Sequence, residues 1–194
     1  MRALRTEKDK DTDDLRRRWL YNLLDWGVYI LIVGVLAFLL LGYVAQRTLV
    51  DGTSMNPTLQ HKDSVLVEKL SYRFGEPKRY DIVVFRYLHQ DNTYYIKRII
   101  GLPGETVQII DGYVYINGER LEDEVYGNDV MISAGRAAEP IVLGQYEYFV
   151  LGDNRNGSSD SRADSVGNVT KSQIVGKAFV RIWPLTEIGF LKHR

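Results

Sequence analysis

A short polar loop contains the first side chain that could act as a nucleophile. Asp51-Gly52 and Asn56-Pro57 are residue pairs typical of tight turns, and they flank Ser54 on both sides. A serine hydroxyl held in one place attacks a carbonyl carbon if a base beside it takes its proton. A single serine in such a loop is more often an ordinary turn residue, so this interpretation depends on a partner elsewhere in the chain.

An apolar-rich strand contains a lysine that could be this partner. Side chains alternate between the two faces of a strand, so Lys97 shares a face with Tyr95 and Ile99, while Arg98 points to the other face. Burial disfavours the charged ammonium and lowers the pKa of a lysine from about 10.4 towards neutrality. The neutral amine is then a general base. The commoner alternative is a strand lysine that reaches into water.

A third segment, residues 152–162, follows the apolar run of residues 148–151 and is dense in Asp, Asn, Ser and Gly. In turns, such side chains form hydrogen bonds to the backbone and to one another. A calcium-binding loop that starts at Asp153 is excluded because Arg155 occupies its third position, where a ligand oxygen is required. We interpret the segment as a turn held by its own polar side chains, with a solvated loop as the alternative.

Histidine and metal chemistry have weaker support. Of the three histidines, His61 follows Ser54 by seven residues, and a Ser-His-Asp triad through it stays open. The neighbours of His61 resemble neither a nucleophile elbow nor a histidine in apolar surroundings. No two histidines or clustered acids have the spacing of metal ligands, so we expect no metal and no cofactor.

Composition excludes several classes of function. Lys+Arg and Asp+Glu balance at 25 each, so the net charge is zero and no binding to nucleic acid is expected. The absence of cysteine excludes a disulfide scaffold and a thiol nucleophile. Seventeen glycines and thirteen tyrosines favour a domain of strands and turns over a helical bundle.

Residues 26–45 form a run of twenty residues without a formal charge. As a helix this run is about 30 Å long, which matches the hydrocarbon core of a bilayer. It is too long for the apolar part of a cleaved signal peptide. We therefore predict a single transmembrane anchor over residues 19–45.

The charges that flank the anchor predict its orientation in the cell membrane. Arg16, Arg17 and Arg18 precede the apolar run, whereas a comparable stretch after it contains only Arg47 and Lys62. By the positive-inside rule the amino terminus is cytoplasmic. We expect residues 1–18 to be a charged, mobile tail in the cytoplasm. Residues 46–194 are expected to form a domain on the outer side of the membrane.

The outer domain has the pattern of short strands separated by turn residues. Asp111-Gly112 lies between two apolar runs and suits a two-residue type I′ turn, because glycine accepts a positive φ. We predict a mainly β fold, an antiparallel β-sheet domain preceded by one helix, with the stretch of acidic and small residues 122–140 as a mobile insertion. Candidate strands are Ser64–Leu70, Asp81–Tyr87, Thr93–Ile100, Thr106–Ile110, Tyr113–Ile116, Tyr146–Leu151 and Ile174–Ile182.

Together, the three polar segments resemble the type I signal peptidase (leader peptidase) family in its compact bacterial form. The resemblance covers about residues 26–183 and includes the order of the segments and the preceding anchor. The matching residues are Ser54-Met55-Asn56-Pro57-Thr58, Lys97-Arg98 with Gly101-Leu102-Pro103-Gly104-Glu105, and Gly152-Asp153-Asn154-Arg155 with Ser158, Asp160, Ser161 and Arg162.

The resemblance implies a serine endopeptidase that removes signal peptides from exported preproteins after small residues at the −1 and −3 positions. Ser54 would be the nucleophile, Lys97 the general base, and Ser158 a hydrogen-bond partner that orients the Lys97 amine. The Ser54 N–H would contribute to the oxyanion hole. Charged supports would be Asp153, Asp160, Arg98 and Arg162, and the substrate pockets would be lined by Val50, Met55, Leu59 and Ile96.

Two departures and two alternatives accompany the resemblance. Gly52 stands where some relatives have a serine that is a second oxyanion donor, and Lys97 stands where relatives of the endoplasmic reticulum and archaea have histidine.

The expected partners are signal-peptide-bearing preproteins and membrane lipid. The alternatives are an inactive membrane-tethered peptide-binding module and a self-cleaving Ser-Lys protease of the repressor type.

Overall fold

The computed structural model describes residues 2–122, 126–127 and 129–192, and it describes only the backbone of residues 2–16 and 39–44. The chain forms two compact units, Met1–Tyr43 and Val44–Arg194. The first unit is helical, and the second is a β domain.

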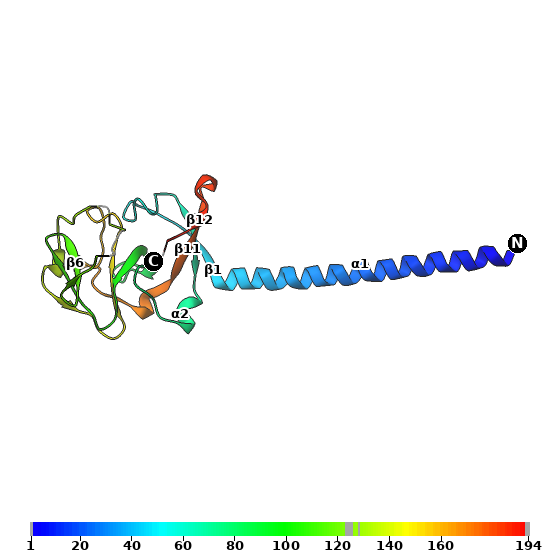
Figure 1. The fold of residues 1–194 in the computed structure, drawn as a ribbon, viewed down its shortest axis with the longest axis horizontal. Helices are drawn as coiled ribbons and strands as arrows, with labels where there is room; N and C mark the ends of the chain where they lie inside the picture. The colour runs from blue at the N-terminus through cyan, green and yellow to red at the C-terminus, as the bar shows by residue number, and fades with distance from the viewer. Residues whose placement is uncertain (1, 123–125, 128, 193–194) are drawn as a thin grey trace. The chain divides into compact units, whose positions relative to one another are not determined.

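Helix α1 is continuous over Arg2–Val44 (Figure 1). Within it, Arg17–Phe38 is long and apolar enough to cross a membrane, and its side chains are not covered by other parts of the protein. The helix of residues 2–18 was not predicted, and the mobility of this tail stays a prediction. No glycine or proline occurs before Gly27, so nothing in the local sequence interrupts the helix.

The larger sheet has the order β1-β2-β11-β3-β4-β9-β10, and β12 pairs with β11. All of its strand pairs within the described residues are antiparallel. The strands are β1 Ala45–Leu49, β2 Ser64–Glu68, β3 Ile82–Arg86, β4 Tyr94–Gly101, β9 Glu147–Leu151, β10 Val169–Thr170, β11 Ile174–Trp183 and β12 Gly189–Phe190, with the short helices α2 Ser71–Phe74, η2 Lys171–Gln173 and η3 Leu185–Glu187 between them.

The smaller sheet has the order β7-β6-β5-β8 and is also antiparallel. The type I′ turn expected between its two longest strands is confirmed, because Asp111 and Gly112 have φ values of 51° and 79°. Figure 1 shows β6 on the opposite side of the β domain from β11 and β12. The elements are β5 Thr106–Ile110, β6 Tyr113–Ile116, β7 Glu119–Arg120 and β8 Ile141–Val142, with the 3-10 helix η1 Gly135–Ala138.

Strand β3 is buried on both faces of the large sheet. Ile82 and Val84 pack into one apolar cluster, and Val83 and Phe85 pack into another, as the alternation of strand side chains requires. A third cluster joins the small sheet to β9. Strand β4 lies between β3 and β9, so its residues are covered from several directions.

The seven predicted strands are all present, with ends that differ by at most two residues. Short strands such as β1, β7 and β8 were not predicted. The described part of the expected mobile insertion is packed against the domain: Met131 is 6% exposed, Ala137 is fully buried, and the Met131 N–H donates to Gly112 O. Tyr126 and Ala134 also pack against the third cluster, so apolar contacts attach the stretch to the core. Residues 123–125 and 128 lie outside the described residues.

The close approach of β11 to β2 requires a glycine at position 176. A Cβ atom there would lie 2.2 Å from the Glu68 carbonyl oxygen, which is backbone and cannot turn away. We expect Gly176→Ala to lower the free energy of unfolding by about 2–3 kcal/mol. The matched control is Gly189→Ala, where a Cβ has nothing within 4 Å and the expected change is below about 0.5 kcal/mol. Denaturant unfolding of the full chain in detergent micelles measures both, and equal stabilities would contradict this account.

Candidate active site

The turn that carries Ser54 is anchored by the apolar residues that follow it. Met55 is 1% exposed and Leu59 is fully buried, and both pack into the cluster formed with β2 and β3. The Leu59 N–H donates to Met55 O, and the Asn56 N–H donates to Thr53 O. Burial of one side of this turn leaves Ser54 half-buried at its other side.

Lys97 lies on β4 with its amine beside the hydroxyl of Ser54. Its Nζ is 2.7 Å from Ser54 Oγ and 3.0 Å from Ile96 O. It also lies over the ring of Tyr95, 5.2 Å from the centroid, so the two side chains share a side of the strand as predicted. Only 4% of Lys97 is exposed. The amine is therefore nearly removed from water and in hydrogen-bonding contact with a candidate nucleophile.

The surroundings of Lys97 favour its neutral form. Burial lowers the pKa of Lys97 from 10.5 to about 8, and the charges of Asp160 and Asp153 oppose this shift. Both carboxylates are themselves paired with arginines, which limits their attraction for an ammonium. At neutral pH a fraction of Lys97 is consequently unprotonated and able to accept a proton.

Asp153 connects the 152–162 loop to β4 and to the Ser54 turn. The guanidinium of Arg98 donates from Nε and Nη2 to the two carboxylate oxygens, at 2.8 Å and 2.7 Å, and both side chains are fully buried. The hydroxyl of Thr58 donates to Asp153 Oδ2 at 2.5 Å. Breaking such a buried pair leaves an uncompensated charge, so these three side chains hold the site together. The role of Thr58 was not predicted, although the residue lies in the segment that carries Ser54.

Asp160 closes the same loop on itself. Arg162 donates from Nε and Nη2 to the two oxygens of Asp160, each at 2.8 Å, and the Gly152 N–H donates to Oδ2 at 3.1 Å. Arg162 Nη2 also donates to Arg155 O. The loop is thus held by its own side chains, as its composition predicted.

The expected hydrogen bond from Ser158 to Lys97 is not formed. Ser158 Oγ is buried without a hydrogen-bond partner, and the carbonyl of Ile96 takes the second contact of the amine. Along this loop Gly157 and Ser159 border the cleft at Ser54, whereas Ser158 borders a separate cavity of about 470 Å³. Its Oγ nevertheless lies near the Ser54 turn, since a Cβ at Gly152 would be 2.2 Å from Ser158 Oγ and 2.4 Å from Ser54 O.

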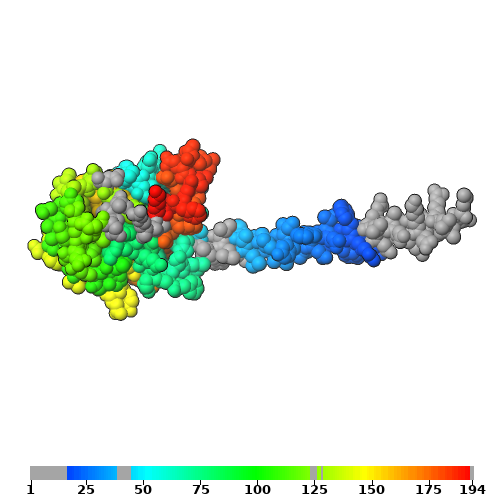
Figure 2. Space-filling model, in the orientation of Figure 1, coloured from blue at the N-terminus to red at the C-terminus, as the bar shows by residue number. Residues whose placement is uncertain are grey.

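A cleft of about 330 Å³ lies over Ser54 and Lys97. Two of the four predicted pocket residues, Val50 and Ile96, line it together with Val84. The other two, Met55 and Leu59, do not line the cleft but lie in the apolar cluster into which Val50 packs. Figure 2 shows the segment after β1 and the C-terminal segment, in cyan and red, side by side on one face of the β domain.

His61 does not contact Ser54. Its Nδ1 accepts a hydrogen bond from the Gly52 N–H at 3.2 Å and lies 3.3 Å from Asp51 Oδ1. The triad that the sequence left open is therefore not assembled in this structure. The same contact engages the N–H of Gly52, the residue that stands where some relatives have a second oxyanion donor.

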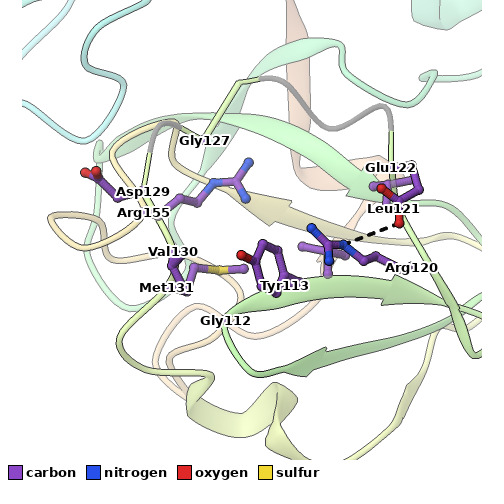
Figure 3. A pocket seen from close by; sticks show the side chains of 11 residues that line it. Gly112, Tyr113, Arg120, Leu121, Glu122, Gly127, Asp129, Val130, Met131 and Arg155 are labelled. Carbon is purple, nitrogen blue, oxygen red and sulfur yellow. Dashed lines mark ion pairs between the residues drawn. The ribbon is translucent and has the colours of Figure 1, made fainter.

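Another cavity, of about 180 Å³, lies between the β6–β7 hairpin and the segment that precedes η1 (Figure 3). In it the guanidinium of Arg120 stacks on the ring of Tyr113 at 3.7 Å and lies 3.5 Å from Glu122. Among its described lining residues there is no serine, threonine, lysine or histidine. It therefore offers no second serine–lysine pair among those residues. Within the described part of the chain, no group of three or more His, Cys, Asp or Glu side chains could hold a metal ion.

Comparisons with known proteins find a matching family and several similar proteins. Residues 23–183 match the family described as Signal peptidase, peptidase S26. The chain is 41% identical to "Probable signal peptidase I-2" of Synechocystis sp. over 175 residues, 87% of this chain and 77% of that protein. It is 38% identical to "Signal peptidase I S" of Bacillus subtilis over 178 residues, 86% and 92% of the two chains. A crystal structure of a signal peptidase I from Enterococcus faecalis V583 is 33% identical, with a TM-score of 0.45, over 53% of this chain and 96% of that chain.

Burial of the Lys97 amine predicts a pH-dependent cost to stability. Below pH 8 the folded protein holds a buried ammonium, and a pKa of about 8 instead of 10.5 corresponds to roughly 3 kcal/mol. Between pH 8 and 10.5 the unfolded chain binds more protons, so stability rises with pH. We expect Lys97→Met to be more stable than the wild type at pH 7, with a difference that shrinks over this window.

The measurement is denaturant unfolding of the full chain in micelles at pH 7, 9 and 10.5. The exposed Lys78 is the control, and Lys78→Met should change stability equally at each pH. A Lys97→Met protein that is less stable than the wild type at pH 7 would contradict the desolvation argument.

Proposed function

Since the chain belongs to the signal peptidase family, peptidase S26, and is a peptidase that removes signal peptides, we propose that Ser54 and Lys97 are its catalytic dyad. The observation that carries the proposal is the 2.7 Å contact between Ser54 Oγ and the buried Nζ of Lys97. A hydroxyl needs a neutral base at hydrogen-bond distance, and this contact supplies one.

In the first half of the reaction, Ser54 Oγ attacks the carbonyl carbon of the scissile bond while Lys97 Nζ takes the hydroxyl proton. The tetrahedral intermediate collapses when the carbon–nitrogen bond breaks and the Lys97 ammonium protonates the leaving amine. The signal peptide then remains as an ester on Ser54. In the second half, Lys97 takes a proton from water, the resulting hydroxide attacks the ester, and Ser54 recovers its proton.

The backbone N–H of Ser54 is the donor that we assign to the oxyanion. It meets no acceptor within the described part of the chain, so it is available for the negative oxygen of the intermediate. The Gly52 N–H is engaged by His61 and is not assigned this role. Asp153, Asp160, Arg98 and Arg162 support the site by holding the loop and pairing each other's charges.

The cleft walls suit small side chains at the −1 and −3 positions of the substrate. Val50, Val84 and Ile96 give the cleft an apolar lining, and Met55 and Leu59 belong to the packed cluster to which Val50 and Val84 contribute. A shallow apolar pocket admits alanine and rejects a larger side chain because its walls cannot move without disturbing the core. Residues at alternate positions of an extended substrate point to the same side, which accounts for a preference at both −1 and −3.

The helix supports action at the cell membrane. We propose that residues 19–45 cross the bilayer once, with residues 1–18 in the cytoplasm and residues 46–194 outside, following the arginines before the span. Nine residues from Ala45 to Ser54 span at most roughly 30 Å. A preprotein whose signal peptide lies in the same lipid would present its cleavage site at this surface.

The dyad is tested by removing each of its two reacting groups. We expect Ser54→Ala and Lys97→Ala each to lower kcat for a signal-bearing precursor by at least about 10³-fold, because neither group acts without the other. Cleavage by the full-length protein in liposomes is followed by gel. The controls Ser172→Ala and Lys78→Ala change exposed residues outside the cleft and should retain activity. A folded Lys97→Ala protein with full activity would end the dyad proposal, and a wild type that binds precursors without cleaving them would indicate a peptide-binding module.

The pH dependence of kcat/KM tests which group is the base. Only neutral Lys97 accepts the proton, so kcat/KM should rise tenfold per pH unit below about 8 and level off above it. This acidic limb should be unchanged in His61→Ala. Loss of the limb in that variant would instead identify the histidine as the base.

A further inference from the structure

Asn154 makes two hydrogen bonds to consecutive carbonyl groups of the turn that carries Ser54, residues 53–59, here called the nucleophile turn. Its backbone N–H donates to Ser54 O at 3.1 Å, and its side-chain Nδ2 donates to Thr53 O at 3.2 Å. The two bonds come from one residue of the 152–162 loop and reach a turn about a hundred residues earlier in the chain. None of the roles assigned so far uses the Asn154 side chain.

The bond to Thr53 O has a consequence for Ser54. The peptide unit between these residues is planar and trans, so the Thr53 C=O and the Ser54 N–H point in opposite directions. A donor that fixes the direction of the carbonyl therefore also fixes the direction of the N–H. The Asn56 N–H donates to the same carbonyl at 3.1 Å, but it belongs to the turn itself and moves with it. Asn154 Nδ2 is the donor that ties the plane to the rest of the domain.

We propose that the carboxamide of Asn154 is a positioning residue for the oxyanion hole. It pins the Thr53–Ser54 peptide plane so that the Ser54 N–H stays directed at the oxygen of the tetrahedral intermediate. The inference rests on the proposed function, because it requires Ser54 to be the nucleophile.

Two glycines make room for this arrangement. A Cβ at Gly157 would lie 2.5 Å from Asn154 Nδ2, so any larger residue would push the carboxamide from its place. A Cβ at Gly152 would lie 2.4 Å from Ser54 O, on the carbonyl that accepts the Asn154 N–H. Both glycines serve the approach of the loop to the nucleophile turn.

The loop contains its own matched control in Asn156. The carboxamide of Asn156 also makes two bonds to backbone, since Oδ1 accepts from the Ile132 N–H at 2.9 Å and Nδ2 donates to Val130 O at 3.1 Å. These bonds hold the segment before η1 and do not involve the nucleophile turn. Loss of either carboxamide removes hydrogen bonds from the same loop, but only Asn154 acts on the Ser54 peptide plane.

The experiment compares Asn154→Ala with Asn156→Ala in the full-length protein in liposomes. A loosely directed oxyanion donor weakens the transition state and not the bound substrate. We therefore expect Asn154→Ala to lower kcat about 10–100-fold with KM changed less than about threefold. Asn156→Ala should keep kcat within about threefold. The acidic limb of the pH profile should stay at its wild-type position in both variants, because the base is untouched.

A peptide boronic acid ending in alanine is a second probe, since its tetrahedral boronate on Ser54 places an oxygen in the oxyanion hole. Asn154→Ala should lose affinity for it by about the factor lost in kcat, and should keep affinity for an uncleavable peptide. Should Asn154→Ala fail to fold, Asn154→Asp removes the donor at the same size, and its boronate affinity is measured on the plateau above the acidic limb.

Three results would overturn the inference: equal kcat in the Asn154 and Asn156 variants, a loss expressed in KM instead of kcat, or unchanged boronate affinity. A shift of the acidic limb in Asn154→Ala would also overturn it, because Asn154 would then act on Lys97. Retained activity in Ser54→Ala is a different result, and it would reject the proposed dyad itself.

Discussion

The exclusion of water from one lysine amine is the constraint on which the rest of this structure depends. An amine on the surface would be protonated at neutral pH and useless as a base, whereas the 4% exposure of Lys97 lowers its pKa to about 8. Burial alone is insufficient, because nearby carboxylates restore the charge. Arg98 and Arg162 pair with Asp153 and Asp160, so the polar loop can lie beside the amine without keeping it protonated.

The architecture of the β domain keeps water from this amine. Strand β4 lies between β3 and β9 and is covered by apolar clusters, so a side chain near its middle is removed from solvent. The loop after β9 brings Asp153 to Arg98 and Asn154 to the turn that carries Ser54. Strand, turn and loop thus meet through buried polar contacts. Such contacts favour one arrangement, because a buried polar group without its hydrogen-bond partner would raise the free energy of the folded state.

Local signals predicted those parts of the fold that local physics determines. The Asp111-Gly112 turn and the strands on either side were predicted to the residue, because positive φ values and alternating apolar residues are properties of short segments. Strands of two residues such as β7 and β8 have no such signal, since they exist only where a neighbouring strand supplies hydrogen bonds. The packing of Met131 and Ala137 was missed for a similar reason: scattered apolar residues without a strand or helix period do not reveal which core they reach.

The sequence by itself determined the membrane-length helix, the antiparallel class of the domain, and the segments from which the site residues come. Only the tertiary structure decided how those segments meet. It joined Ser54 to Lys97 across 43 positions of sequence, linked Thr58 and Asn154 to the site by hydrogen bonds, and left Ser158 Oγ without a hydrogen bond to the amine. The physical reason is that the burial of a group and its distance to a hydrogen-bond partner depend on all residues that surround it in space. The sequence specifies only the group and its neighbours along the chain.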